Sequence, residues 1–324
     1  MVTAATSTLS QHNETPHLDW IDLSRHLDVL ADRVDRMDKR QSRTVSLVNE
    51  TPSSADEIIA KAFESDATIF EIGEILRSTL LGRQGAVIVT LAQADADAER
   101  LQKLQLLVGY ALGHNVNHRS EDQPERALFE ITPRTDVRYG GNGENASSIG
   151  PHTDGSGVQA IIDVLGLCCI AQTQGSGGQT LVSNALQAVL SLTEKDRTLL
   201  AQPWPRTNPY DRKAEPTTFV RRPIALLRVP FEFSYHPQRI RQALDRCGEA
   251  TPERFEALAN LDAALWRYST AVKLERGELL LVNNRRFGHG RIGFAHDPMS
   301  PRRLERQWIS WRASEARLSI LRHE

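Results

Sequence analysis

Residues 151–156 read Pro151-His152-Thr153-Asp154-Gly155-Ser156, and residues 284–291 read Asn284-Arg285-Arg286-Phe287-Gly288-His289-Gly290-Arg291. Together the two stretches supply two imidazoles and one carboxylate. On a β-strand the side chains i and i+2 point to the same side, so we expect His152 and Asp154 to grip one ion while Thr153 turns away. Gly155 then lets the backbone turn sharply beside the metal.

Two histidines and one carboxylate form the facial ligand set of non-haem Fe(II) oxygenases, which leaves the opposite face open for a co-substrate and O₂. A His-x-Asp pair alone often arises by chance, and its alternative reading is a polar loop. The downstream half strengthens the metal reading. Residues 278–284 predict a buried strand that ends in a polar turn, and His289 follows in a Gly-flanked, Arg-rich turn. We therefore predict that His152, Asp154 and His289 bind Fe(II).

Four segments resemble, in order, the taurine dioxygenase/clavaminate synthase-like superfamily of Fe(II)/2-oxoglutarate oxygenases. They are His152-Thr153-Asp154, Gly177-Gly178-Gln179-Thr180-Leu181-Val182, residues 284–291, and Arg302-Arg303-Leu304-Glu305-Arg306-Gln307-Trp308-Ile309. The resemblance spans roughly residues 82 to 312. It implies three cofactors and co-substrates, namely Fe(II), 2-oxoglutarate and O₂.

The resemblance also implies a site for the distal carboxylate of 2-oxoglutarate. Thr180 lies where the family places a hydroxyl on that carboxylate. Arg306 is expected to be the main anchor, with Arg302 near the keto-acid end, because a guanidinium fork matches a carboxylate bidentately. Arg302 and Arg306 share a face on a regular strand, and a bulge would bring Arg303 there instead. The alternative for a single arginine here is a solvated strand edge.

The resemblance implies hydroxylation as the default outcome, with desaturation, cyclisation or epoxidation of a secondary metabolite as alternatives. Halogenating relatives replace the carboxylate ligand by a small residue, so Asp154 argues against chlorination. A rival of another class is a non-catalytic cupin-like protein that binds a metal or ligand. A hydrolytic metal enzyme is a weaker rival, because nothing suggests a general base beside the site.

The substrate is expected to be small and polar, such as an amino acid or an amino-acid-derived natural-product intermediate. The loop before His152 is rich in hydrogen-bonding groups, and nearby arginines could anchor an anion. The candidate substrate residues are Arg138, Asn142, Glu144, Asn145, Arg212 and Arg291. The spare histidines are expected to be surface or packing residues; they are His114, His118, His236 and His296.

Composition fits an ordinary globular enzyme of 324 residues with a formal net charge of −2. The near-neutral charge predicts a small-molecule substrate and no nucleic-acid partner. The sequence shows no apolar run long enough for a membrane span and no secretory signal. Its three cysteines are expected to be packing thiols, which suits the cytoplasm. We expect a monomer or a homodimer.

The distribution of short strands predicts a mainly β protein with flanking helices around a double-stranded β-helix, the jelly-roll or cupin-like core. Residues 1–54 are expected to form a tail and an amphipathic helix over Leu18–Lys39, and residues 55–324 the oxygenase domain. The proline-containing stretch 202–222 is predicted to be a lid.

Overall fold

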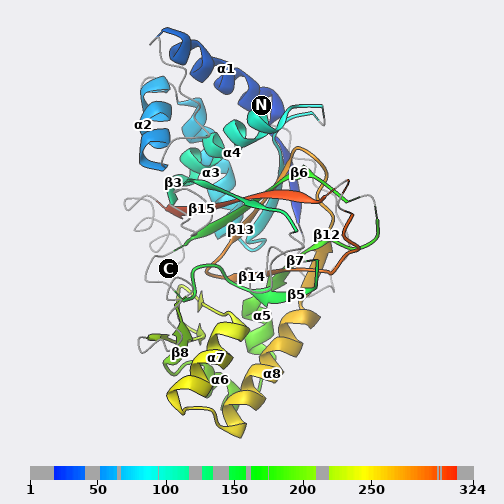
Figure 1. Ribbon diagram of the computed structural model, residues 1–324. Coiled ribbons are helices and arrows are strands. Elements are labelled where there is room, and N and C mark those ends of the chain that lie inside the picture. The colour runs from blue at the N-terminus through cyan, green and yellow to red at the C-terminus, as the bar shows by residue number, and fades with distance from the viewer. Residues whose placement is uncertain are drawn as a thin grey trace.

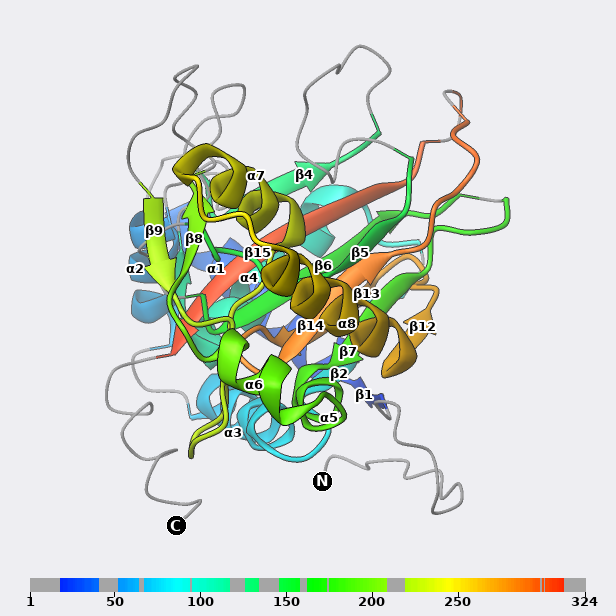
Figure 2. The ribbon, with the colours of Figure 1, turned by 90° about the horizontal axis from the view of Figure 1, so that it is seen from below.

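Two β-sheets face each other at the centre of the computed structural model (Figure 1). The structure describes residues 18–40, 52–63, 67–93, 95–116, 126–133, 146–157, 162–173, 175–208, 219–297, 299 and 301–311. One group of helices covers one sheet and a second group lies beyond the other, and Figure 2 shows the second group in front of the strands. This architecture agrees with the predicted mainly β fold with flanking helices.

The major sheet has seven strands in the order β1-β2-β13-β6-β15-β3, with β4 also paired to β15. Its strands are β1 (Asp19–Asp22), β2 (Ala86–Thr90), β13 (Glu278–Asn283), β6 (Val164–Ala171), β15 (Arg303–Trp311), β3 (Gly113–Val116) and β4 (Leu128–Ile131). All of its pairings are antiparallel except that of β1 with β2. The sheet's strands therefore come from both ends of the chain.

The minor sheet has four strands in the order β12-β7-β14-β5. They are β12 (Ser269–Val272), β7 (Thr180–Asn184), β14 (Phe287–Arg291) and β5 (Ile149–His152). Two short pairs lie outside the sheets: β8 (Trp204–Thr207) with β9 (Phe219–Arg222), and β10 (Ala225–Leu226) with β11 (Glu232–Phe233). The minor sheet thus carries both histidines of the predicted metal site.

The helices form two groups that are separate in sequence. The first group is α1 (Ser24–Arg40), α2 (Pro52–Ala62), α3 (Thr68–Leu81) and α4 (Ala98–Leu112). The second is α5 (Ala185–Leu190), α6 (Glu194–Leu200), α7 (Pro237–Cys247) and α8 (Pro252–Arg267). Helix α4 packs on β6 and β15, while α5 and α8 pack on β7. No helix in the described ranges is long and apolar enough to cross a lipid bilayer.

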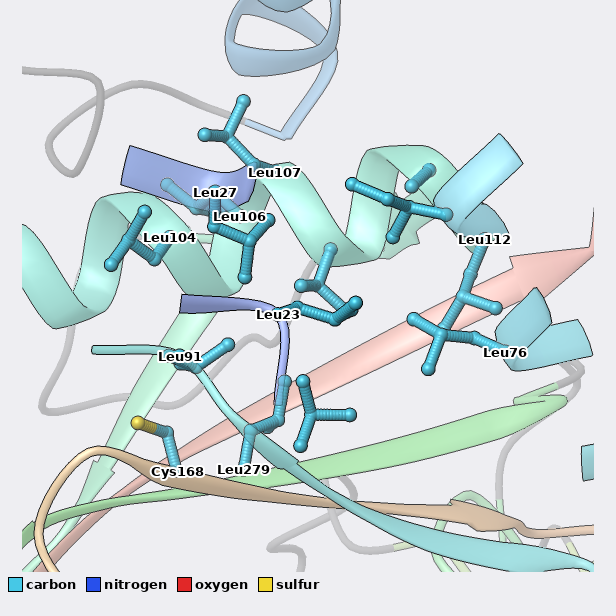
Figure 3. Packing of buried hydrophobic residues seen from close by; sticks show 14 of the residues in the cluster. Leu23, Leu27, Leu76, Leu91, Leu104, Leu106, Leu107, Leu112, Cys168 and Leu279 are labelled. Carbon is cyan, nitrogen blue, oxygen red and sulfur yellow. The ribbon is translucent and has the colours of Figure 1, made fainter. Parts of the chain in front are cut away.

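Three apolar clusters hold these layers together. The first lies between the major sheet and α1–α4, where Leu27, Leu107 and Leu279 are at most 1% exposed (Figure 3). The second fills the α5–α8 region, and the third lies between the two sheets and includes Leu304 and Trp308. Because Leu304 and Trp308 belong to the third cluster, the even-numbered positions of β15 face the space between the sheets. Each fully buried side chain of this size contributes roughly 1.5–3 kcal/mol to the stability of the fold.

The helix predicted from Leu18 was wrong at its start. Residues 19–22 instead form β1, which pairs in parallel with β2, and α1 begins at Ser24. The backbone N–H and the hydroxyl of Ser24 both donate to Asp22, at 3.0 and 2.7 Å. The apolar residues from 18 onward have a helical spacing, but residues 19–22 pair instead with the free edge of β2, which the local apolar pattern does not reveal.

The turn predicted around His289 was also wrong, because residues 287–291 form the central strand β14. Glycines usually weaken a strand, but here they permit close pairing on both sides. A Cβ built on Gly290 would lie 2.5 Å from the carbonyl oxygen of Ile149 on β5. Helix α7 and strands β3 and β12 were not predicted at all.

The predicted lid, 202–222, is partly ordered into a strand pair. Its two ends are β8 and β9, and its middle, 209–218, lies outside the described residues. Arg206 is fully buried and donates to the carbonyl oxygens of Trp204, Arg222, Pro223 and Ser234. This guanidinium fastens the pair to the segment before α7.

Candidate active site

The two predicted histidine ligands are direct cross-strand neighbours. His152, the last residue of β5, pairs with His289 in the middle of β14, and their ring centroids are 4.3 Å apart. Strand β5 ends at His152, so Asp154 stands in the turn that follows rather than on the strand. The three side chains nevertheless meet, with one ligand atom of each within 4.8 Å of the others.

Asp154 divides its two carboxylate oxygens between different partners. Oδ2 accepts hydrogen bonds from Arg306 at 3.1 Å and from the indole N–H of Trp308 at 2.7 Å. Oδ1 faces Nε2 of His152 at 3.9 Å and Nε2 of His289 at 3.7 Å. Adjacent ligands of an octahedral ion with bonds of about 2.1 Å lie about 3 Å apart, so small movements would close this set on a metal.

The electrostatics of the site favour the charge states that ligation needs. Burial alone would raise the pKa of Asp154, but the charge of Arg306, the two imidazoles and the Trp308 hydrogen bond lower it below its ordinary value. Burial lowers the pKa of His152, and it lowers that of His289 to about 3. The site therefore presents one carboxylate and two neutral imidazoles near neutral pH.

The tautomer of His152 follows from its hydrogen bond. Its Nδ1 lies 3.0 Å from the carbonyl oxygen of Gly150, which can only accept, so Nδ1 carries the proton. The lone pair of Nε2 then points toward the other two ligands. A fixed ring with a free lone pair is the usual state of a metal-binding histidine.

Two polar residues hold the turn that carries Asp154. The Asp154 N–H donates to Oδ1 of Asn284, and Nδ2 of Asn284 donates back to the Asp154 carbonyl oxygen. Thr153 is 1% exposed and exchanges hydrogen bonds with the backbone of Tyr235. The expectation that Thr153 turns away from the metal is confirmed by these contacts. The role of Asn284 was not predicted, although Asn284 belongs to the second quoted motif.

Arg302, the residue before β15, is buried against Phe294. It is 3% exposed, and in the described parts of the chain no acceptor bonds its Nε and no carboxylate pairs with it. Its guanidinium lies over the ring of Phe294 at 5.7 Å, and burial lowers its pKa to about 10. It stays charged at neutral pH, and a buried, unpaired charge costs several kcal/mol. An anion is the natural complement.

Thr180 and Arg291 lie toward the same end of the site as Arg302. They are cross-strand partners on β7 and β14, and Thr180 is 2% exposed. Arg291 also lies over Phe294, at 5.3 Å, and donates to the carbonyl oxygen of Ser147. Burial and the nearby charge of Arg302 lower the pKa of Arg291 to about 10.

Arg306, predicted as the main anchor of 2-oxoglutarate, is bonded to Asp154 in this structure. Its guanidinium lies over the rings of Phe129 and Trp308, at 5.0 and 5.2 Å. The register of β15 against β6 shifts between Arg303 and Leu304, yet Arg303 still points away and pairs with Glu130 at 3.2 Å. The predicted alternation of the three arginines therefore survives the irregularity.

A cavity of about 270 Å³ adjoins the turn of Asp154 on the side of α5–α8. Charged groups of both signs line it: Arg222, Glu232 and Arg285. Of the predicted substrate residues only Arg291 can be placed; Arg138, Asn142, Glu144, Asn145 and Arg212 lie outside the described residues.

His236 is a site neighbour that the sequence did not reveal. It was expected to be a surface or packing residue, but its ring centroid lies 5.1 Å from that of His152. It is not part of the ligand group. No sequence signal marked it, since it is a lone histidine before a proline.

Comparisons with known proteins identify one family. A family model described as "Taurine catabolism dioxygenase TauD, TfdA family" matches residues 70–308. No curated protein sequence matches the chain.

Two solved structures illustrate the fold. An asparagine oxygenase in complex with Fe(II), 2S,3S-3-hydroxyasparagine and succinate is 16% identical with a TM-score of 0.70, covering 92% of this chain and 96% of that one. A non-haem iron oxygenase, OrfP, in complex with Fe and alpha-ketoglutaric acid is 15% identical with a TM-score of 0.65, covering 93% and 96%. At such identities the likeness establishes the fold, the cupin-like double-stranded β-helix that the sequence predicted. With the family model spanning most of the chain and the His-Asp-His set assembled, the protein belongs to the TauD/TfdA family and is a 2-oxoglutarate-dependent non-haem iron dioxygenase.

Proposed function

We propose that this dioxygenase hydroxylates a small polar amino acid, with iron held by His152, Asp154 and His289 and with Arg302 as the main anchor of 2-oxoglutarate. The observation that carries the proposal is the buried guanidinium of Arg302, which has no carboxylate partner in the described residues and lies four positions before Arg306, the partner of Asp154. A protein that used its metal only for structure would have no need of such a carboxylate receptor.

The donor set suits Fe(II). Two neutral imidazole nitrogens and one carboxylate oxygen converge from one side, which leaves further coordination positions for a chelating co-substrate. When bound, the metal and 2-oxoglutarate supply oxidation by O₂: the substrate C–H becomes C–OH while 2-oxoglutarate becomes succinate and CO₂. The chain's part is to orient the reactants and to exclude water.

Individual side chains orient the metal ligands and the co-substrate. Arg306 and Trp308 bond Oδ2 of Asp154, which turns Oδ1 toward the metal position. Arg302 would receive the distal carboxylate bidentately, and Thr180 would donate its hydroxyl. This assignment reverses the order of the two arginines expected from the sequence, because Arg306 already has a carboxylate partner.

The substrate class rests on the cavity and on the fold relatives. The cavity beside Asp154 carries both charge signs, which suits a zwitterion. The relatives include the asparagine oxygenase and OrfP, one structure of which holds Fe, succinate and (3S)-hydroxy-L-Arg, at 15% identity and a TM-score of 0.63. Free cysteines at positions 168, 169 and 247 fit the further proposal that the protein acts in the cytoplasm, as a monomer or homodimer.

The test is succinate formation from 2-oxoglutarate, with Fe(II) and air, across the twenty L-amino acids. We expect one or a few of them to stimulate turnover and to gain 16 mass units, about one oxygen atom, even in high chloride. His152→Ala, Asp154→Ala and His289→Ala should each lose anaerobic Fe(II) binding, whereas His114→Ala, at an exposed position, should not. Full iron binding by any triad variant would contradict the ligand set. If none of the twenty amino acids stimulated turnover, the proposed substrate class would be wrong.

A further inference from the structure

The segment 231–236 alternates between two environments. Phe231, Phe233 and Tyr235 belong to the apolar cluster of α5–α8, and the Tyr235 hydroxyl donates to Asp262 at 2.6 Å. The residues between them, Glu232, Ser234 and His236, are only partly buried. Glu232, Phe233 and Ser234 line the cavity beside Asp154, and His236 follows two residues on in extended backbone, at φ −149° and ψ 99°.

The extended segment is firmly attached to the metal-binding turn. Thr153 N–H donates to the carbonyl oxygen of Tyr235 at 2.6 Å, and Tyr235 N–H donates to the Thr153 hydroxyl at 2.9 Å. Arg206 also bonds the carbonyl oxygen of Ser234 at 2.6 Å. Because these bonds fix the backbone on both sides, the His236 ring is held beside His152 and does not hang on a free loop.

The His236 imidazole has unused hydrogen-bonding capacity. It meets the His152 ring edge-on at an interplanar angle of 61°. Its Nδ1 is buried without a hydrogen-bond partner in the described portion of the chain, and it does not cap α7. A buried polar atom without a partner costs about 1–3 kcal/mol, so a bound molecule that supplies one is favoured. The two ring nitrogens of an imidazole can each take part in a hydrogen bond.

We propose that His236 is a substrate-positioning residue, which hydrogen-bonds a polar group of the amino-acid substrate beside His152, next to the cavity that Glu232 and Ser234 line. The inference rests on the proposed function. It adds that the substrate carries an amide, hydroxyl or carboxylate close to the carbon that is oxidised. A purely aliphatic side chain would leave the imidazole unsatisfied and bind more weakly.

The experiment compares His236→Phe, which keeps a ring of similar shape, with His236→Gln, which keeps hydrogen-bonding atoms. The probe is the L-amino acid that most stimulates the wild-type protein. We expect His236→Phe to raise KM for that amino acid about tenfold, as loss of one hydrogen bond predicts, and to uncouple succinate from hydroxylated product. His236→Gln should recover most of both losses. Gln238→Ala, at an exposed position two residues on, is the matched control.

Anaerobic titrations with Fe(II) and with 2-oxoglutarate separate the possible failures. Unchanged affinities in both His236 variants are expected, since His236 is not a ligand. An unchanged KM and coupling ratio in His236→Phe would overturn the inference and leave the proposed function standing. Weakened Fe(II) binding in both variants would instead make His236 a support of the metal site. If no amino acid stimulates the wild-type protein, the proposed function fails and the inference fails with it.

Discussion

Asn284 and Asp154 are joined by a reciprocal pair of hydrogen bonds across 130 positions of sequence. The Asp154 N–H donates to Oδ1 of Asn284 at 2.9 Å, and Nδ2 of Asn284 donates to the Asp154 carbonyl oxygen at 3.0 Å. Nδ2 also reaches the carbonyl oxygen of Ile162 at 3.0 Å. The residue that opens the second motif thus fixes the backbone of the first, while His289 supplies the remaining ligand.

Asn284→Ala should therefore weaken iron binding without removing a ligand. We expect an affinity loss of about 10–100-fold, the usual effect of losing a group that orients a ligand. Unfolding free energy should also fall by about 1–3 kcal/mol, because buried backbone groups lose their partners. Anaerobic Fe(II) titration and chemical denaturation measure the two effects. Asn260→Ala, which removes an amide bonded to Asp196 on the helices, should leave iron affinity intact.

The three neighbouring arginines should differ sharply in their effect on 2-oxoglutarate. Arg302→Lys should weaken its binding by about 1.5–3 kcal/mol, because a bidentate, charge-assisted contact is lost from a buried position. Arg306→Lys should mainly disturb Asp154 and hence iron. Arg303→Lys, which changes a surface pair with Glu130, is the control. The measurement is an equilibrium titration of each iron-loaded protein with 2-oxoglutarate. If Arg306→Lys weakened 2-oxoglutarate binding and Arg302→Lys did not, Arg306 would be the main anchor, as expected from the sequence.

Removing the charge of Arg302 should stabilise the protein when 2-oxoglutarate is absent. Arg302→Met replaces a buried, unpaired guanidinium by an apolar chain of similar length, so we expect the unfolding free energy to rise by roughly 1–3 kcal/mol. The same variant should lose 2-oxoglutarate binding. Denaturant titration without the co-substrate is the measurement. A drop in stability would mean that Arg302 has a partner that stabilises the fold.

Gly290→Ala should separate the two histidine strands. Its added Cβ would lie 2.5 Å from the Ile149 carbonyl oxygen, and backbone cannot move aside as a flexible side chain can. We expect a loss of roughly 1–3 kcal/mol in stability, together with weaker iron binding as His289 moves from His152. Gly175→Ala, whose added Cβ would lie 3.9 Å from the Thr173 hydroxyl in ordinary van der Waals contact, should be close to neutral in both measurements.

Glu305 should make the protein less stable as the solution becomes basic. Burial raises its pKa from 4.5 to about 7, against the lowering effect of its hydrogen bond from Gln102. Between pH 4.5 and 7 the native state binds a proton that the unfolded state releases, so stability falls as pH rises through this window. Glu305→Gln should therefore be more stable by roughly 2–3 kcal/mol at pH 8 and equal at pH 4. Glu256→Gln, at an exposed position, is the control for the loss of one carboxylate.

The sequence by itself determined the candidate ligand residues that the fold brings together, because side chains with metal-binding chemistry recur in two motifs whose order and residue types are distinctive. It also determined the class of fold, since short strands and terminal helices leave local patterns of apolar residues. In helix α4 the apolar residues and the N-cap, Asp97, which accepts a hydrogen bond from the Arg100 N–H, are local signals of this kind.

Only the tertiary structure decided which arginine bonds Asp154 and which histidine borders the ligands. Arg302 and Arg306 are chemically alike and share a face in the sequence pattern, but Arg306 bonds Asp154, whereas Arg302 packs against the ring of Phe294 and has no carboxylate partner in the described residues. His236 reaches His152 because the Thr153–Tyr235 hydrogen bonds join segments 82 positions apart. Such contacts depend on pairing between distant segments, which no local periodicity encodes. The residue types therefore indicated the chemistry of the site, but which residue contacts which partner depended on the tertiary structure.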